Sequence, residues 1–196
     1  MKDDLDAIIL AAGNSQRMGS CKFFLLMDSG LTFFENIIIQ LSNFGIENII
    51  VVTQKTHLKE LKRLSKKHKI SPIFITNDFP ERGRFYSVQL GIKHTIQSEF
   101  SFIHNADSPF IETSVLEKLY DSREKAEVVY PIFNKKGGHP VLVNNKVKQG
   151  LIKMPVNSVL KESLKEFKRI SVDVDNELIT ADIDTTEDYE KYILKK

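Results

Sequence analysis

Residues 8–22 of this chain read Ile-Ile-Leu-Ala-Ala-Gly-Asn-Ser-Gln-Arg-Met-Gly-Ser-Cys-Lys. The apolar start predicts a strand over Ala7–Leu10, and the small residues that follow predict a loop where that strand ends. Further apolar runs alternate with helical patterns along the chain, which favours a parallel sheet covered by helices on both faces. Later in the chain, pairs of apolar runs joined by short turns predict hairpins, which would add antiparallel strands and make the sheet mixed. The sequence therefore predicts a three-layer α/β fold with a mostly parallel mixed sheet.

The other elements follow from the spacing of apolar residues. Strands are predicted at Asn48–Thr53, Pro72–Thr76, Phe100–His104, Val128–Phe133 and Pro140–Val143, and a final hairpin pairs Ile170–Val174 with Ile179–Ile183. Helices are predicted over Leu31–Phe44, 59–69, Arg84–Gln97, Thr113–Tyr120, Ser158–Phe167 and Glu187–Leu194. No repeat, low-complexity tract or Pro/Gly-rich linker interrupts this order, so we expect a single domain over residues 1–196.

The composition is typical of a soluble globular protein, with 41% hydrophobic and 28% charged residues. No apolar stretch approaches the ~20 residues of a membrane span, and the first residues lack the basic and apolar regions of a signal peptide. Cys21 is the one cysteine, so no internal disulfide can form. The net charge of +2 gives no global attraction to nucleic acid. We expect a cytoplasmic protein with neither nucleic acid nor membrane as a partner.

The loop after the first strand has the chemistry of a phosphate site. Ala11, Ala12 and Gly13 have little or no side chain, so a ligand can approach the backbone, and free N–H groups in such a turn can point at an anion. Arg17 offers a planar guanidinium and Lys22 a mobile ammonium for phosphate oxygens. The loop lacks the Gly-Lys-Ser/Thr of a Walker A motif and the glycine spacing of a dinucleotide fingerprint. The loop therefore predicts a nucleoside triphosphate site of a kind that differs from both of these motifs.

The stretch resembles the signature Leu-Ala-Ala-Gly-x-Ser-x-Arg-Met-Gly-x-x-Lys of nucleotidyltransferases with a MobA-like fold. Leu10–Lys22 matches it at every specified position. An ordinary strand-to-loop turn with incidental charges is the alternative, but a match at fixed spacing favours the family. The resemblance implies a Rossmann-like nucleotidyltransferase fold in which Leu10 and the small loop bind the nucleotide. It also implies that Arg17 and Lys22 act on the triphosphate.

A carboxylate follows the predicted strand Phe100–His104, in the sequence His-Asn-Ala-Asp-Ser-Pro. Asp107 would stand at the carboxyl end of that strand, where ligands of open α/β sheets bind. One carboxylate there suits Mg²⁺, which takes few protein oxygens and completes its shell with substrate phosphates. The family has Asp-x-Pro at this point, which implies that Asp107 is the main metal ligand. The alternative is an aspartate that only opens a turn, and we expect His104 to be a packed structural residue.

A second acidic segment precedes the last helix and resembles the family's Asp-x-Asp-Thr-Pro-Glu-Asp. Alternation along the predicted strand would direct Asp182 and Asp184 to the same side. Asp184 would then stand at the strand end and join Asp107 around one Mg²⁺. The alternative is helix capping by Thr185 or Thr186, with the acidic residues that follow favoured by the helix dipole.

Two glycine-bearing segments complete the resemblance. Gly83 and Ser87 match the family's Gly-x-x-x-Ser-x-x-x-Gly, which implies contacts with the base or ribose; the alternative is an ordinary helix with an unexplained Gly91. Gly138 and His139 match the family's Gly-His-Pro, which implies contacts with the second substrate; the alternative is a plain hairpin turn.

The predicted function is Mg²⁺-dependent nucleotidyl transfer. A phosphate oxygen of the acceptor would attack the α-phosphorus of the triphosphate, and pyrophosphate would leave. The resemblance makes CTP and a molybdopterin-type acceptor the leading substrates, with a molybdoenzyme as a candidate partner.

Two alternatives stay open. A sugar- or alcohol-phosphate nucleotidyltransferase is disfavoured by the Gly-His-Pro segment and by the end of the chain at residue 196. A non-catalytic nucleotide-binding regulator is disfavoured by the presence of Asp107 and Lys22.

Overall fold

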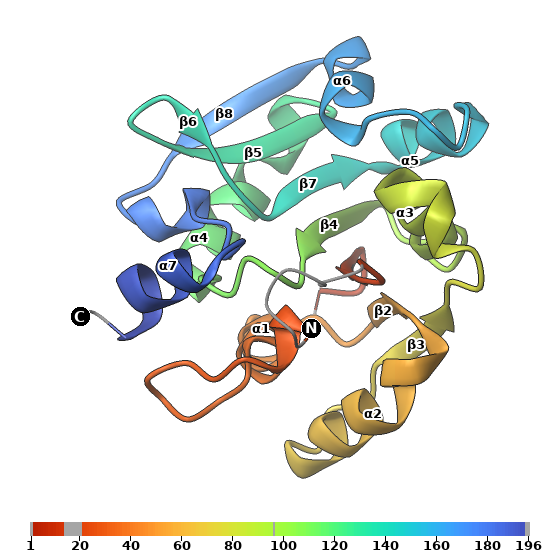
Figure 1. Cartoon of the computed structure of the whole chain (residues 1–196). Coiled ribbons are helices and arrows are strands. Elements are labelled where there is room, and N and C mark those ends of the chain that lie inside the picture. The colour runs from red at the N-terminus through yellow and green to blue at the C-terminus, as the bar shows by residue number, and fades with distance from the viewer. Residues whose placement is uncertain (1, 14–20, 96, 195–196) are drawn as a thin grey trace.

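The computed structural model describes residues 2–13, 21–95 and 97–194 (Figure 1). In these residues eight strands form one sheet in the order β3-β2-β1-β4-β7-β5-β6, and β8 pairs with β5. The strands are β1 (Leu5–Ala11), β2 (Ile49–Thr53), β3 (Ile73–Thr76), β4 (Phe100–Asn105), β5 (Val128–Phe133), β6 (Lys136–Gly137), β7 (Val141–Asn144) and β8 (Arg169–Asp173). The predicted α/β fold with a mixed, mostly parallel sheet is confirmed.

The strand β1 lies between parallel β2 and β4 and is buried along its whole length. Leu10 pairs with Val52 on one side and with Asn105 on the other. The pairing of the two chain segments extends one residue beyond β4, because the Ala106 N–H donates to the Leu10 carbonyl at 3.1 Å. The residues that follow β1 and β4 therefore emerge side by side at one edge of the sheet.

Helices cover both faces of this sheet (Figure 1). One core packs the β1 residues Leu5, Ala7 and Ile9 against α1 (Phe33–Asn43), α2 (Leu58–Lys67) and α4 (Thr113–Asp121). The other core packs Ile8 and Leu10 against α3 (Gly83–Lys93) and α5 (Asn145–Lys153). Because the side chains of a strand alternate between faces, β1 supplies both cores, and the three predicted layers result.

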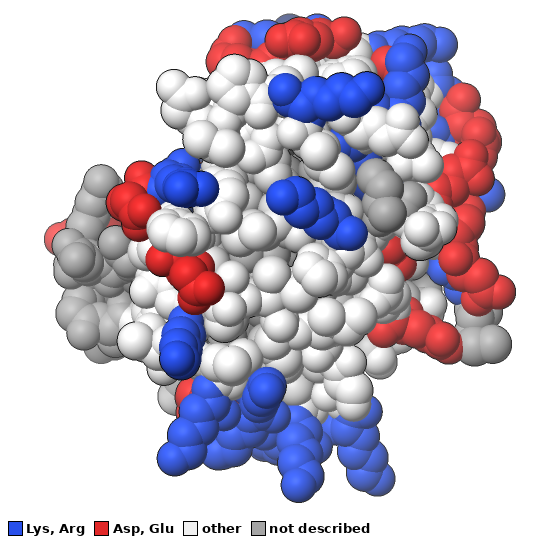
Figure 2. Space-filling view, turned by 90° about the vertical axis from the view of Figure 1, so that its right-hand side faces the viewer, with Lys and Arg blue, Asp and Glu red and all other residues white. Residues whose placement is uncertain are grey.

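The helix α2 is amphipathic, as its sequence predicts. Leu61 and Leu64 are buried, whereas Lys59, Lys62 and Lys66 are exposed. Lysine and arginine side chains accordingly gather at the bottom of Figure 2, where α2 lies. In the part of the chain that the structure describes, the helices are all too short or too polar to cross a membrane.

The final predicted hairpin is wrong in its second strand. β8 forms, but it pairs in parallel with β5, and residues Glu177–Thr180 form the 3₁₀ turn η7. The side chain of Asn176 accepts a hydrogen bond from the Leu178 N–H at 2.8 Å, which turns the backbone where the prediction extends it. The alternation argument for Asp182 and Asp184 fails with this strand.

The segment between β7 and β8 also differs from the prediction. The helix α5 was not predicted, and its cap is the Asn144 side chain, which accepts from the Val147 N–H at 3.1 Å. The predicted helix Ser158–Phe167 is reduced to a single turn, α6 (Leu160–Ser163), followed by the 3₁₀ turn η6 (Leu164–Glu166). The chain ends in α7 (Thr186–Tyr189) and the π-helical turn η8 (Glu190–Leu194).

Gly91 explains why α3 lies so close to the sheet. A Cβ at this position would collide with the Ile8 side chain and would lie 3.3 Å from a methyl group of Val52. The glycine therefore permits close packing of α3 on β1 and β2. The close approach is to the strands rather than to the loop after β1, and it fixes the position of the residues at the start of α3.

A stability prediction follows from Glu35 at the start of α1. Glu35 is 2% exposed, and its Oε1 accepts from Lys67 Nζ and His68 Nε2, each at 2.8 Å. Burial opposes ionisation, but the contacts with Lys67, Thr32 and His68 outweigh it and lower the pKa of Glu35 to about 2. A carboxylate whose pKa is lowered by folding stabilises above its unfolded pKa and loses that contribution as the pH falls.

We therefore expect the Glu35 contribution, up to about 3 kcal/mol of unfolding free energy, to fade from about pH 4.5 downwards. Urea unfolding of wild type and Glu35→Gln between pH 3 and pH 7 measures it, and the difference between the two should shrink towards pH 3. Glu117→Gln, at an exposed position on α4, is the control and should show a much smaller difference. A difference for Glu35→Gln that is independent of pH would contradict the prediction.

Candidate active site

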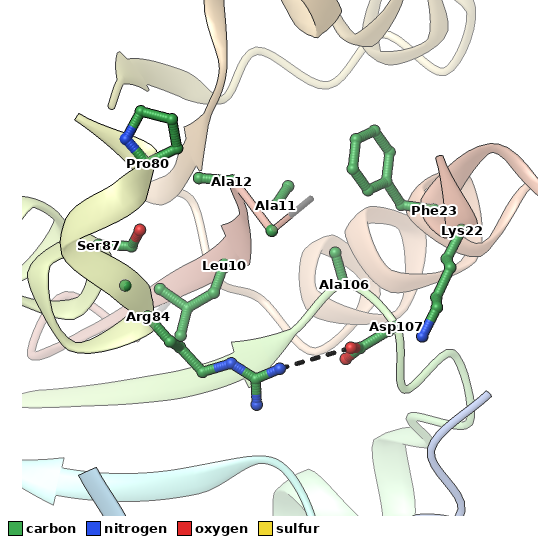
Figure 3. Close-up of a pocket in the computed structure, with 12 residues that line it drawn as sticks. Leu10, Ala11, Ala12, Lys22, Phe23, Pro80, Arg84, Ser87, Ala106 and Asp107 are labelled. Carbon is green, nitrogen blue, oxygen red and sulfur yellow. Dashed lines mark ion pairs between the residues drawn. The ribbon is translucent and has the colours of Figure 1, made fainter. Parts of the chain in front are cut away.

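A pocket opens at the carboxyl ends of β1 and β4 (Figure 3). The end of β1, the 3₁₀ turn η2 (Lys22–Phe24), the start of α3 and the turn after β4 all contribute to it. Its lining residues are Leu10, Ala11, Ala12, Gly13, Lys22, Phe23, Pro80, Gly83, Arg84, Ser87, Ala106 and Asp107. This is the edge of a parallel sheet at which α/β proteins bind ligands.

The predicted nucleotide-binding residues meet in this pocket. Those that line it are Leu10, Ala11, Ala12, Gly13, Lys22, Gly83 and Ser87, together with the predicted metal ligand Asp107. Arg17 lies outside the described residues. The structure thus brings together residues that are far apart in the sequence, and their roles stay predictions.

Asp107 is a mostly buried carboxylate whose two oxygens have different surroundings. Oδ2 lies 3.5 Å from Arg84 Nη2, whereas buried Oδ1 has no hydrogen-bond partner among the described residues. Burial raises the pKa of Asp107, and the nearby charge of Arg84 opposes this effect. A buried anionic oxygen without a donor is unfavourable unless a cation contacts it. The site therefore fits a hard divalent cation such as Mg²⁺.

Asp184 also lies near the turn after β4, but a backbone contact rather than strand alternation places it there. The Ile183 N–H donates to the Asp107 carbonyl at 3.3 Å, which holds this segment against the turn after β4. Asp184 Oδ1 then accepts from the nearly buried Lys22 Nζ at 2.5 Å. Thr185, rather than Thr186, caps α7.

Asp182 also faces this turn and accepts from Ser108 Oγ at 2.6 Å. No group of three or more His, Cys, Asp or Glu side chains that could hold a metal ion occurs within the described ranges. A metal here would therefore have one or two carboxylate ligands and would take its remaining ligands from substrate or water, as Mg²⁺ does. Asp107 and Asp184 as metal ligands stay predictions.

Two histidines beside the pocket are neutral near pH 7. Burial lowers the pKa of His104 to about 3 and also lowers the pKa of His139. His104 Nε2 donates to the Ser108 carbonyl at 2.8 Å, as expected of a packed structural residue. His139 Nε2 accepts from Asn105 Nδ2 at 2.9 Å, so the side chain is held against the end of β4.

The glycine of the Gly-His-Pro segment has a structural reason of its own. A Cβ on Gly138 would overlap the Ile179 carbonyl, and the His139 N–H donates to that carbonyl at 3.1 Å. The close approach at Gly138 is thus to the protein's own backbone in η7. Gly138 and His139 lie outside the lining of the pocket, and acceptor binding by them stays a prediction.

Sequence reasoning missed Arg84, which points across the pocket towards Asp107 (Figure 3). The available signal was its place in the segment that already held Gly83 and Ser87. Asn77 was missed too: its Nδ2 donates to Ser87 Oγ at 3.0 Å, and its Oδ1 accepts from the Phe79 N–H at 2.9 Å. Asn77 therefore orients Ser87 from behind the pocket.

Comparison with known proteins agrees with this fold. Residues 7–170 match the family model described as MobA-like NTP transferase domain. The chain is 29% identical over 185 residues to the molybdenum cofactor cytidylyltransferase of Escherichia coli strain K12, which covers 94% of this chain and 93% of the relative. It is 26% identical over 209 residues to a probable molybdenum cofactor guanylyltransferase of Natranaerobius thermophilus, with 97% and 96% covered.

Among solved structures, the fold is similar to the Mycobacterium sp. strain JC1 homologue of Mycobacterium tuberculosis Rv0371c. The TM-score is 0.82 at 18% identity, with 100% of this chain and 98% of that chain covered. The chain belongs to the MobA-like NTP transferase family and is a nucleotidyltransferase. Enzymes of this family use a nucleoside triphosphate and a phosphorylated acceptor.

The first prediction for this site concerns Asp107. Asp107→Asn keeps the side-chain volume but removes the charge, so we expect turnover to fall by a factor on the order of 100 or more. The unfolding free energy should be unchanged or higher, because a buried charge is removed. Pyrophosphate release and urea unfolding measure the two effects. Asp121→Asn, at an exposed position ending α4, is the control; a near-normal rate for Asp107→Asn at saturating Mg²⁺ would refute the assignment.

The second concerns Lys22. Lys22→Ala should weaken triphosphate binding by about tenfold or more, because a charge-assisted contact in a largely buried position is lost. Lys22→Arg should restore the affinity only in part, since a planar fork does not replace a point charge. Calorimetric titration with CTP and Mg²⁺ measures both variants. Equal affinity for wild type and Lys22→Ala would show that Lys22 does not contact the nucleotide.

Proposed function

We propose that this enzyme transfers a cytidylyl group from CTP to the phosphate of a molybdopterin-type acceptor and releases pyrophosphate, with Mg²⁺ as its cofactor. The observation that carries this proposal is Asp107, a mostly buried carboxylate in the pocket lining, one oxygen of which is buried and has no partner among the described residues. Two cations, Arg84 and Lys22, lie on either side of it (Figure 3).

The chain's own residues supply binding and charge balance. Ala11, Ala12 and Gly13 let the nucleotide lie close to the backbone at the end of β1. Lys22 would leave its contact with Asp184 and neutralise triphosphate oxygens. Asp107, with Asp184, would hold Mg²⁺, which lowers the charge that repels an incoming nucleophile when it is bound.

No general base is required for this reaction. The attacking group is a phosphate oxygen of the acceptor, which is already anionic, so catalysis consists of positioning and of neutralising charge. The neutral His139, fixed by Asn105 close to Asp107, suits a role in orienting the acceptor by hydrogen bonding. The product would pass to an enzyme that uses the modified cofactor, and a molybdoenzyme is the candidate partner.

The choice of CTP rests on Ala12. Ala12 lines the pocket and is almost fully buried, in the same core as Leu10 and Phe85. A glycine at this position would leave more room, and a purine needs more room than a pyrimidine does. The relatives named above include a cytidylyltransferase and a guanylyltransferase, so the base must be chosen by such local differences.

The substrate assignment leads to a prediction on nucleotide selectivity. We expect CTP to be used better than GTP, and Ala12→Gly to narrow the gap by an amount on the order of 1–3 kcal/mol, as one methylene does in a specificity pocket. Pyrophosphate release with each of the four triphosphates, alone and with a phosphorylated pterin, sugar or alcohol, measures it.

The same assay separates the alternatives. Turnover only with a sugar or alcohol phosphate would replace the proposed acceptor, and a preference for GTP or ATP would remove the cytidylyltransferase assignment. Nucleotide binding without turnover on any acceptor would favour a regulator.

A further inference from the structure

Arg84 lies in the pocket but has no role in the reaction proposed above. It is the second residue of α3, and Gly91 fixes that helix on the sheet. Its side chain is 59% exposed and extends across the pocket towards Asp107 (Figure 3). The ionic partner of its guanidinium among the described residues is Asp107.

The contact between the two side chains is ionic but loose. The distance of 3.5 Å from Arg84 Nη2 to Asp107 Oδ2 exceeds that of a good hydrogen bond. The other oxygen, Oδ1, is buried and receives nothing from the described residues. Arg84 thus balances part of the charge of Asp107 while its planar set of N–H donors stays available.

We infer that Arg84 is a phosphate-binding residue that neutralises Asp107 in the free protein and moves to a substrate phosphate when a divalent cation contacts Asp107. This inference rests on the proposed function. A guanidinium matches the oxygens of a phosphate in a bidentate manner, and the residue lines the same pocket as Lys22. A cation on Asp107 repels Arg84, whereas a phosphate attracts both.

Metal and phosphate binding are therefore coupled through this side chain. A metal that binds alone must displace Arg84 from Asp107 without giving it a new partner. A metal that arrives with a phosphate group provides that partner. Loss of Arg84 should then strengthen binding of the bare metal and weaken binding of the metal–nucleotide complex, two changes of opposite sign.

The test uses the full chain and equilibrium binding. Mn²⁺ alone is titrated by electron paramagnetic resonance, and CTP in saturating Mg²⁺ is titrated by calorimetry, for wild type, Arg84→Gln and Arg84→Lys. Arg82→Gln is the matched control, because Arg82 is also exposed but its guanidinium lies over the Phe79 and Tyr86 rings, at 4.4 and 5.1 Å.

We expect Arg84→Gln to bind Mn²⁺ about threefold to tenfold more tightly and Mg²⁺–CTP about tenfold more weakly than wild type, in line with the loss of one charged contact. The affinities of Arg84→Lys should lie between those of wild type and Arg84→Gln. Those of Arg82→Gln should stay within about twofold of wild type in both titrations, as for a surface charge.

The outcomes separate the sources of the phosphate. If Mn²⁺ binds more tightly to Arg84→Gln and Mg²⁺–CTP binding is unchanged, a KM for the phosphorylated acceptor raised about tenfold assigns the contact to the acceptor and supports the inference. Arg84→Gln values equal to those of Arg82→Gln in every titration, or affinity lost for metal and nucleotide alike, would overturn it. Failure of the wild type to bind Mn²⁺ or any nucleotide would instead remove the proposed function.

Discussion

The site depends on the way in which β1 is held between two parallel neighbours. Both edges of Leu5–Ala11 are hydrogen-bonded, and both faces are buried. A slip by one residue would break two ladders and exchange the side chains of the two cores. The register is therefore fixed, and Leu10 ends beside Val52 and Asn105. Ala12 and Gly13, which follow β1, and Asp107, which follows β4, therefore line the same pocket.

Charge in this region is balanced in pairs that join separate segments. Asp107 faces Arg84 from α3, and Asp184 faces Lys22 from η2. A metal-bound triphosphate could contact all four groups: its phosphates could replace the carboxylates as partners of Arg84 and Lys22, and its metal could replace the cations as partner of the carboxylates. Ligand-free protein thus avoids unpaired charges at a partly buried edge, where they would be costly. The same groups remain free to exchange partners, because Arg84 and Asp184 are largely exposed.

Much of the pocket could be predicted from the sequence, and the misses have identifiable causes. Gly13 and Asp107 each follow a strand with a strong apolar pattern, so their positions at strand ends could be inferred. The helix α5 could not, because its sequence is mostly polar and contains Gly150. It forms because the fold buries Val147, Leu151 and even Lys148, whose Nζ donates to the carbonyls of Thr95 and Ser98. Tertiary contacts there outweigh local propensity.

By itself, the sequence determined the order of strands and helices up to β7, the strand ends at which small and charged residues stand, and the family that the chain resembles. These features are local, because apolar periodicity and motif spacing are properties of short segments. Only the tertiary structure decided which charged groups meet, as Arg84 does with Asp107 and Lys22 with Asp184. It also decided that Asp184 arrives by a backbone contact at Ile183 rather than by strand alternation. Ion pairing depends on distance in space, which the spacing of residues along a chain does not specify.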